Sequence, residues 1–326
     1  MSALLNGIKT NNFVIVGRAG IDFFTDVGVK VEEAETLTVD LGGSAANIGA
    51  GICKLGGRAS LVTCVSDDSV GSYCINRLRH YGVDPTHVRK VGGEYRNSLA
   101  VYESVLQDHR NVIYRNGAAD FQMDMEDVEA VDYSAFGALI TAGTVFAAEP
   151  SRSATHRSFE LAKAAGLPII FDVDYRPYSW TSAQEASDVL TRAAEASDMI
   201  VGNDEEFGFM AGDYSKGLET AKRLSETSAS LVIYKLGEGG AVTFYEGDEI
   251  RTGIYPVTAV KPNGAGDAFM AGLMTSLADG HDLRTSVLRG SASASITVSK
   301  PGCAPAMPSP DQLEDFLKGH AGPTEP

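Results

Sequence analysis

The sequence predicts an α/β fold in which a mostly parallel central sheet is covered by helices on both faces. From about residue 136 onward, short apolar runs alternate with segments of helical periodicity, and that alternation is typical of βαβ units. The expected strands lie near 139–141, 168–172, 199–201 and 231–234, and the expected helices near 153–165, 183–194 and 216–226.

The first part of the chain follows the same rhythm but carries two β-rich stretches that do not fit it. Strands are expected at 13–16 and 61–65, with helices from Gly42-Gly43-Ser44 to residue 55 and from residue 70 to 80. The stretches at about 18–40 and 95–117 show β-like patterns without helix signals. We expect them to pair as one small accessory sheet that covers the site, within a single domain spanning residues 1–326.

Composition and charge exclude several classes of function. The 326 residues include 44% hydrophobic side chains, enough for a large core, and the net charge of −16 argues against nucleic acid as a partner. No segment approaches the about 20 apolar residues of a membrane span, and the polar N-terminus has no signal-peptide core. Cys53, Cys64, Cys74 and Cys303 show no metal or redox spacing, so we expect reduced cysteines in a cytoplasmic protein.

The segment Gly264-Ala265-Gly266-Asp267-Ala268-Phe269 predicts an anion site at the start of a helix. The two glycines let backbone amides approach a ligand closely, and the unpaired amides of a first helical turn attract negative charge. Asp267 lies in that turn, where a carboxylate can take the proton of a nucleophile that attacks phosphorus. The alternative is that Asp267 only complements the helix dipole, which is worth roughly 0.3–1 kcal/mol. The chain has neither the third glycine of a dinucleotide-binding motif nor a Gly-Lys-Ser/Thr P-loop.

Polar residues also follow several of the expected strands. In open α/β sheets, ligands bind outside the carboxyl ends of the strands. The residues at these ends are Asp22, Gly42, Gly43, Asn47, Asp172, Asp174, Arg176, Asn203, Glu206, Lys235 and Gly237. A single residue of this kind is more often a cap or a turn residue. Because successive strand ends converge on one edge of the sheet, the whole set predicts a ligand site there.

Taken together, these motifs resemble those of the ribokinase-like (PfkB) carbohydrate kinase family. The matching segments, in family order, are Gly42-Gly43-x-x-x-Asn47, Asn203-Asp204-Glu205-Glu206, Lys235 to Gly240, Gly264 to Phe269 and Pro301 to Pro308. The resemblance covers about Asn12 to Leu317, which is most of the chain. It implies a three-layer α/β/α domain with a small β-sheet lid, in agreement with the two β-rich stretches.

The resemblance also implies transfer of the γ-phosphoryl group of ATP, with Mg²⁺, to a sugar hydroxyl. The implied catalytic base is Asp267, and the amides of Gly264, Ala265 and Gly266 form the anion hole. The implied substrate ligands are Asp22, Gly42, Gly43 and Asn47. The implied nucleotide ligands are Asn203, Lys235, Gly237, Gly240, Gly264, Gly266 and Met307, while Glu206 holds Mg²⁺ through water. A homodimer through the lid is expected, because an isolated small sheet is marginal in water.

One departure from the family pattern concerns Lys261-Pro262-Asn263, where the family commonly has an Asp-Thr-Thr-like run. The aspartate there is associated with a monovalent cation, so a monovalent-cation requirement is doubtful. A Lys-Pro-x run, together with Gly17 to Asp22 and Phe171 to Trp180, resembles the 5-dehydro-2-deoxygluconokinase subgroup of myo-inositol catabolism. The segment from Phe171 to Trp180 also resembles 2-keto-3-deoxygluconate kinases.

Both of these substrates carry a carboxylate, and a guanidinium fork matches a carboxylate in geometry. We therefore expect Arg176 and Arg115 to bind it, the alternative being that each arginine pairs with a neighbouring acid such as Asp172 or Asp120. Trp180, the only tryptophan, is expected in the core. The expected activity is phosphorylation of a terminal hydroxyl of 5-dehydro-2-deoxy-D-gluconate. The alternatives are a 2-keto-3-deoxygluconate kinase, then a fructokinase or ribokinase, and outside enzymes a sugar-sensing pseudokinase.

Overall fold

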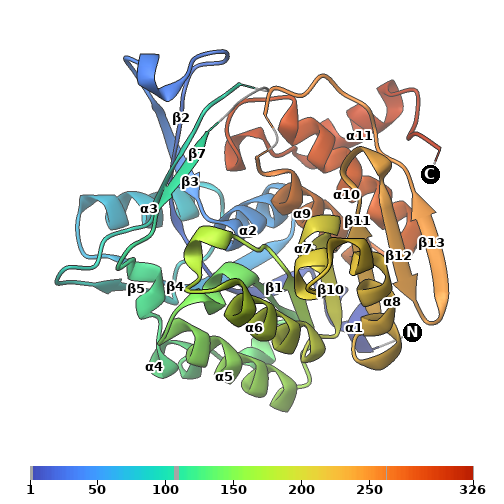
Figure 1. Cartoon of the computed structure of the whole chain (residues 1–326), viewed down its shortest axis with the longest axis horizontal. Coiled ribbons are helices and arrows are strands. Elements are labelled where there is room, and N and C mark those ends of the chain that lie inside the picture. The colour runs from blue at the N-terminus through green and yellow to red at the C-terminus, as the bar shows by residue number, and fades with distance from the viewer. Residues whose placement is uncertain (1–2, 106–109, 262, 326) are drawn as a thin grey trace.

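The computed structural model describes residues 3–105, 110–261 and 263–325, and within them nine strands form one central sheet (Figure 1). The strands lie in the order β13-β12-β11-β10-β9-β8-β1-β4-β5. Their bounds are β1 (Asn12–Val16), β4 (Arg58–Ser66), β5 (Val88–Val91), β8 (Ala138–Ala142), β9 (Ile169–Asp172), β10 (Met199–Asn203), β11 (Leu231–Lys235), β12 (Ala241–Tyr245) and β13 (Asp248–Thr252). From β11 to β5 all neighbours are parallel, which confirms the mostly parallel sheet that the sequence predicts.

Three strands at the edges of this sheet were not among the predicted ones. β5 ends one edge and carries two exposed charged residues, Arg89 and Lys90, so it lacks an apolar run. β12 and β13 form an antiparallel hairpin at the other edge. Its two turn residues, Glu246 and Gly247, both have positive φ (52° and 90°), as the type I′ turn of a two-residue hairpin requires.

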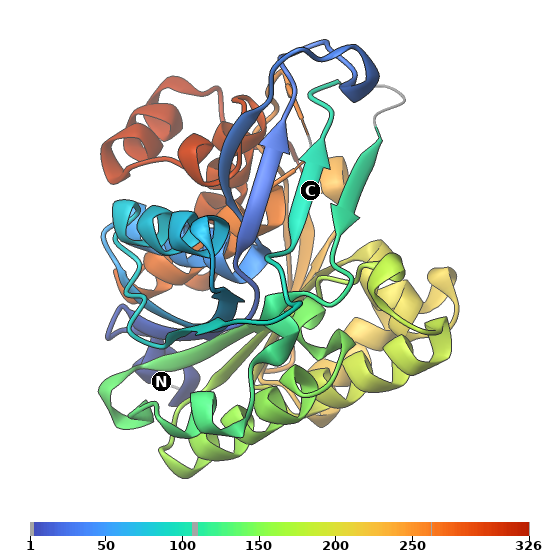
Figure 2. The ribbon, with the colours of Figure 1, turned by 90° about the vertical axis from the view of Figure 1, so that its left-hand side faces the viewer.

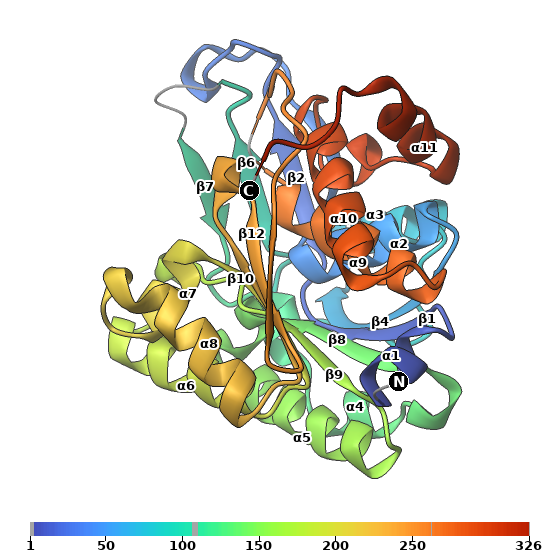
Figure 3. The same ribbon diagram turned by 90° about the vertical axis from the view of Figure 1, so that its right-hand side faces the viewer.

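Helices cover both faces of the central sheet (Figure 3). One face carries α1 (Ala3–Ile8), α2 (Ser44–Lys54), α3 (Ser69–His80), α9 (Ala265–Ala278), α10 (Leu283–Val298) and α11 (Pro310–Gly319). The other carries α4 (Met125–Glu129), α5 (Ser151–Ala164), α6 (Ala183–Glu195), α7 (Asp204–Met210) and α8 (Gly217–Thr227). Successive residues of β1 face the two layers alternately: Phe13 and Ile15 join one core cluster, Val14 and Val16 the other. The central strands are therefore apolar on both sides, which is why they appear in the sequence as continuous apolar runs.

A second, four-stranded sheet rises from one end of the central sheet (Figure 2). Its strands, in spatial order, are β3 (Thr38–Gly42), β2 (Gly20–Phe24), β6 (Leu99–Tyr102) and β7 (Asn111–Tyr114). β2 pairs in parallel with β6, so two segments far apart in the chain share this sheet. The fold thus contains the small β-sheet lid that the sequence predicts.

Two general features of the chain bear on its chemistry. No helix within the described ranges has the length and apolar character needed to cross a membrane. All four cysteines are free thiols.

Candidate active site

A cavity of about 710 Å³ lies at the carboxyl ends of the central strands, between the lid and the first turns of α2 and α9. Most of the predicted site residues line it, namely Asp22, Gly43, Asn47, Arg115, Arg176, Asn203, Glu206, Lys235, Gly237, Gly240, Gly264, Ala265, Gly266 and Asp267. They come from segments spread over the whole chain, and the parallel sheet brings them to one edge.

Two predicted residues do not line the cavity. Gly42 lies just behind it, because a Cβ at this position would come within 2.0 Å of Asp22 Oδ1. Met307 is 1% exposed, and its sulfur would lie 2.7 Å from a Cβ built on Gly51. Met307 therefore packs in the layer between α2 and the loop before α11, and this placement gives no support to the predicted nucleotide contact.

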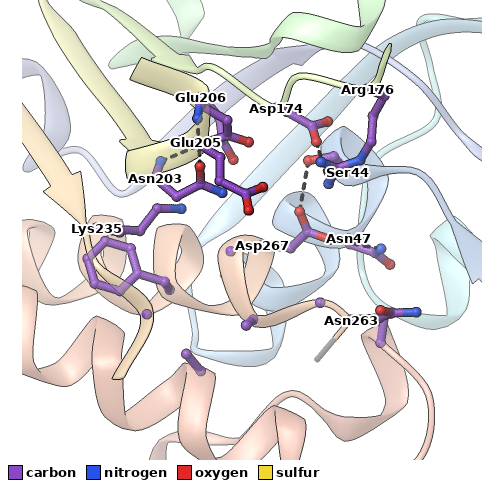
Figure 4. Close-up of a pocket in the computed structure, with 18 of the residues that line it drawn as sticks. Ser44, Asn47, Asp174, Arg176, Asn203, Glu205, Glu206, Lys235, Asn263 and Asp267 are labelled. Carbon is purple, nitrogen blue, oxygen red and sulfur yellow. Dashed lines mark hydrogen bonds and ion pairs between the residues drawn. The ribbon is translucent and has the colours of Figure 1, made fainter. Parts of the chain in front are cut away.

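Asp267 lies at the start of α9, where two helices meet (Figure 4). Its Oδ1 accepts a hydrogen bond from Ser44 Oγ at 2.8 Å, and its Oδ2 accepts one from Asn47 Nδ2 at 3.0 Å. Burial raises the pKa of Asp267, with the nearby Asp174 adding to the effect and the two hydrogen bonds opposing it. A buried carboxylate that is held in one orientation and has a raised pKa is suited to accept a proton.

The first turn of α9 has the features from which the sequence predicts an anion site. Gly264 caps the helix with φ of 81°, a left-handed conformation that favours glycine. The backbone N–H groups of the first helical turn have no carbonyl partner within the helix. They are therefore free to donate to a ligand at the helix start. A Cβ on Gly266 would lie 3.5 Å from Lys235 Nζ, so the ammonium group faces this same turn. Amides, helix dipole and lysine together favour a bound phosphate.

Asn203 and Glu206 form a reciprocal capping box at the start of α7. The Glu206 amide donates to Asn203 Oδ1 at 2.8 Å, and the Asn203 amide donates to Glu206 Oε2 at 2.8 Å. This structural role explains the Asn-x-x-Glu spacing, which the sequence interpretation attributed to the nucleotide and metal alone. Glu206 is still buried at the wall of the cavity, and burial raises its pKa while Lys235 opposes the shift.

The part of the cavity lined by Arg18, Asp22, Arg115 and Arg176 is called the acceptor end below. Asp22 is 1% exposed there, and its Oδ1 has no hydrogen-bond partner among the described residues. Burial raises the pKa of Asp22 to about 7, although Arg18 lowers it. Gly43 allows this arrangement, because a Cβ there would lie 2.4 Å from the Arg18 carbonyl oxygen. Asp22 lines the cavity, and its unpaired Oδ1 lies close to Gly42, so the carboxyl group can accept a further hydrogen bond.

The two arginines predicted to bind a carboxylate are both engaged with acids. Arg115 forms a buried ion pair with Asp120 and donates to the Thr144 carbonyl oxygen at 2.8 Å. Arg176 pairs with Asp174 at 2.7 Å. The structure thus shows the pairing that the sequence left open as the alternative, although the partner of Arg176 is Asp174 rather than Asp172.

Lys261 is 2% exposed, and its ammonium group donates to the Asn263 carbonyl oxygen. Burial lowers its pKa, while Cys303, Asp267 and Asp22 raise it. The lysine thus places a positive charge beside the loop that opens α9. Pro262, the second residue of the predicted run, lies outside the described residues.

The structure also adds cavity residues that the sequence did not single out. Ser44 hydrogen-bonds the proposed base, and its signal was its position three residues before Asn47 at a helix start. Arg18 follows Gly17 after the end of β1 and lines the cavity; it belongs to the segment from Gly17 to Asp22 that carries part of the resemblance, but it was not singled out as a site residue. Trp180 does not line the cavity. It is half-buried against the core beneath α5 and α6, near the expected place.

Comparison with known proteins identifies relatives of this chain. The chain is 35% identical to a 5-dehydro-2-deoxygluconokinase from Photobacterium profundum, and the match covers 94% of each protein. It is 33% identical to a 5-dehydro-2-deoxygluconokinase from Clostridium perfringens, and that match covers 94% of this chain and 93% of the relative. The solved fructokinase with bound ATP from Xylella fastidiosa superposes with a TM-score of 0.84 at 19% identity, over 94% of this chain and 98% of that one. The model of the pfkB family of carbohydrate kinases matches residues 10–310. The chain therefore belongs to the pfkB family of carbohydrate kinases.

Proposed function

We propose that the protein transfers the γ-phosphoryl group of ATP to a terminal hydroxyl of 5-dehydro-2-deoxy-D-gluconate. The observation that carries the proposal is Asp267, buried and oriented beside the anion site of α9. The substrate follows from the relatives that bear this name over almost the whole length of both chains. The use of ATP is supported by the kinase family and by a similar fold that holds ATP.

In this reaction the acceptor hydroxyl lies against Asp267 and gives it a proton. The hydroxyl oxygen then forms a bond to the γ-phosphorus, and the bond between that phosphorus and the β,γ-bridging oxygen breaks, so ADP leaves. The unpaired amides at the start of α9 and the Lys235 ammonium stabilise charge on the transferred group. Asn47 and Ser44 keep the carboxylate pointed at the hydroxyl.

The residues present also fit Mg²⁺, which prefers carboxylate oxygens and water. Within the described residues no three His, Cys, Asp or Glu side chains are grouped to hold a metal directly. Glu206 has one carboxylate oxygen in its capping box and lines the cavity near Asp172 and Glu205. Glu206, Asp172 and Glu205 would hold the Mg²⁺ ion through bound water, which is the role that the family resemblance implies for Glu206. When bound, Mg²⁺ neutralises charge on the phosphates.

The proposal includes no requirement for a monovalent cation. The buried ammonium group of Lys261 already supplies a fixed positive charge beside the loop of Asn263. The family's usual aspartate, which would attract a free cation, is replaced by this lysine. Activity should therefore be the same in potassium and in a bulky ammonium salt at equal ionic strength.

We also propose a homodimer through the lid. The outward face of the lid carries an apolar row across all four strands, formed by Val39, Phe23, Val101 and Val112, which pair in register. Val39 is 39% and Val112 is 44% exposed, and Tyr114 on the same face is 59% exposed. An apolar sheet face of this kind is covered most simply by its copy.

A panel of acceptors with ATP and Mg²⁺ tests the proposal. It contains 5-dehydro-2-deoxygluconate, 2-keto-3-deoxygluconate, gluconate, fructose and ribose, with ADP release as the readout. The first compound should give the highest kcat/KM. A preference for fructose or ribose would disprove the sugar-acid assignment, and binding without turnover of any acceptor would favour the sugar-sensing alternative.

A further inference from the structure

Arg18 is a buried guanidinium at the acceptor end of the cavity, 6% exposed. Its Nη1 donates to Ser98 Oγ at 2.9 Å, at the point where the chain enters β6 of the lid. Within the described residues it forms no ion pair within 4.0 Å, and its Nε and Nη2 have no hydrogen-bond acceptor. In this respect it differs from Arg115 and Arg176, whose charges are neutralised by Asp120 and Asp174.

The local fold makes room for this side chain. A Cβ on Gly20 would lie 2.9 Å from Arg18 Nη1 and 2.6 Å from the Ser98 carbonyl oxygen, so only glycine there lets the guanidinium lie against the lid. Charged and titratable groups around it include Asp22, Tyr102, Asp120 and Tyr178. The Asp22 carboxyl group interacts electrostatically both with Arg18 and with Asp267, the proposed base.

We propose that Arg18 binds the carboxylate of the acceptor. The inference rests on the proposed function for the substrate class, and it replaces the expectation that Arg176 and Arg115 do this. A guanidinium with two unengaged donors matches a carboxylate in charge and geometry. The two donors without acceptors are buried with the side chain, so a sugar carboxylate satisfies them better than the neutral hydroxymethyl group of a sugar alcohol does.

The same geometry sets the direction of the acceptor. In this proposal its terminal hydroxyl lies at Asp267, its middle hydroxyls lie along the Asp22 carboxyl group, and its carboxylate lies at Arg18, and all three residues line the cavity. Because Arg18 is bonded to the lid through Ser98, the acid also contacts a residue that joins the cavity to β6. Arg176 is less suited to this role, since its side chain is 46% exposed and is already paired with Asp174.

A matched pair of ligands tests the role of Arg18 without requiring turnover. D-Gluconate and D-glucitol have the same carbon chain and differ in the carboxylate, and their binding can be measured by calorimetry and by competition. The wild type should bind gluconate about 10- to 100-fold more tightly than glucitol, the value of a charged hydrogen bond. Arg18→Met should abolish this ratio, whereas Arg176→Met should keep most of it.

Controls separate this role from others. Arg18→Lys keeps the charge but loses the fork, so it should keep part of the ratio, and thermal unfolding checks each variant. If Arg18→Met does not fold, Arg18→Gln and Arg18→Lys carry the same comparison. An unchanged ratio in folded Arg18→Met, no preference in the wild type, or equal weakening of both ligands would overturn the proposal. Failure of the proposed function is a separate result, namely no turnover of 5-dehydro-2-deoxygluconate by a wild type that still prefers gluconate.

Discussion

The two ends of the cavity are built in different ways. At the phosphate end, one helix start and one lysine make the site: the first turn of α9 supplies amides, and Lys235 faces the same turn. At the acceptor end, charged side chains come from three separate segments, which contain Arg18 and Asp22, Arg115, and Asp174 and Arg176. Their contacts with one another decide which of them can bind a ligand. Arg115 and Arg176 form ion pairs with acids, whereas Arg18 forms none within 4.0 Å in the described part of the chain, although Asp22 and Asp120 stabilise its charge.

The difference shows which kind of site a short motif can specify. Backbone amides at a helix start have the same geometry wherever a similar glycine pattern occurs. A side-chain charge, in contrast, is available only when no neighbour has paired with it, and that depends on tertiary structure. Substitutions at the two ends should therefore differ in kind as well as in size.

Asp267 stands between the two ends, and its loss should have the largest effect. Asp267→Asn keeps the shape and the first-turn position but cannot accept the proton, so kcat should fall by about 10²–10⁴-fold with a small change in KM. Steady-state kinetics measures both constants. Asp279→Asn, at the opposite end of the same helix, is the matched control and should keep wild-type activity. Turnover of Asp267→Asn within a few-fold of the wild type would show that another group is the base.

At the phosphate end, Lys235→Met should lower kcat by about 10²-fold, because a preorganised charge at the transferred group is lost. The effect should be the same for every acceptor, in contrast to the acceptor-specific effect expected at Arg18. Lys222→Met, on the exposed side of α8, is the control. If the effect of Lys235→Met on kcat differed between acceptors, the two ends of the cavity would not act independently as proposed.

At the acceptor end, Asp22 should give the enzyme a pH dependence. Its pKa of about 7 means that the charged form, which accepts substrate hydroxyl hydrogens, is lost as the pH falls below 7. We expect kcat/KM to fall up to tenfold for each pH unit below that value. Asp22→Asn should have lower activity overall and should lack this limb of the profile. A limb that persists unchanged in Asp22→Asn would assign it to another group.

The Asp22 carboxyl group should make the folded protein less stable as the pH rises, whereas it makes kcat/KM larger. The pKa of Asp22 is about 7 in the folded protein against an ordinary value of 3.8, so between these values the folded state holds a proton that the unfolded state releases. The free energy of unfolding should then decrease as the pH rises from about 4 to about 7, by up to about 1.4 kcal/mol per unit. Urea unfolding at pH 5 and pH 8 should show a smaller decrease in Asp22→Asn than in the wild type. An equal decrease in the wild type and in Asp22→Asn would show that Asp22 does not cause the pH dependence of stability.

The smallest effect on turnover is expected at the outward face of the lid. Val112→Asp with Tyr114→Asp should convert the proposed dimer to a monomer in sedimentation, because charge is placed in an apolar interface. The neighbours Asn111 and Ile113 line the cavity and stay unchanged, so activity should change by only a few-fold. A wild type that sediments as a monomer at micromolar concentration would count against the dimer.

The parts of the structure that the sequence predicted share a local physical cause. Continuous apolar runs such as 13–16 arise because both faces of a central strand are buried, and α9 begins directly after Gly264, whose positive φ favours glycine. The edge strand β5 was missed because its exposed charges leave no apolar run. The hairpin of β12 and β13 was also missed, although its Glu246-Gly247 turn carries a local signal.

The site shows the same limit. Asp267 was predicted correctly as a cavity residue at a helix start, because its place in the first turn of α9 follows from the adjacent glycines. Ser44 was missed, since its bond to Asp267 joins positions 223 residues apart. Met307 is expected at the nucleotide from the family resemblance of its loop, and the burial of its side chain against Gly51 of α2 could not be foreseen from that loop. Contacts of this range depend on the packed fold, which local spacing does not encode.

The burial of the four thiols has a consequence for how the enzyme withstands chemical damage. Burial raises the pKa of Cys53 to about 11 and that of Cys74 to about 12, and it raises the pKa values of Cys64 and Cys303 further still. Alkylating agents and peroxides attack the thiolate, which is scarce at neutral pH when the pKa is this high. Cys303 lines the cavity beside Gly264, yet it should stay unmodified. The folded kinase should keep its activity in iodoacetamide at pH 7.5 and take up the label only after it is unfolded.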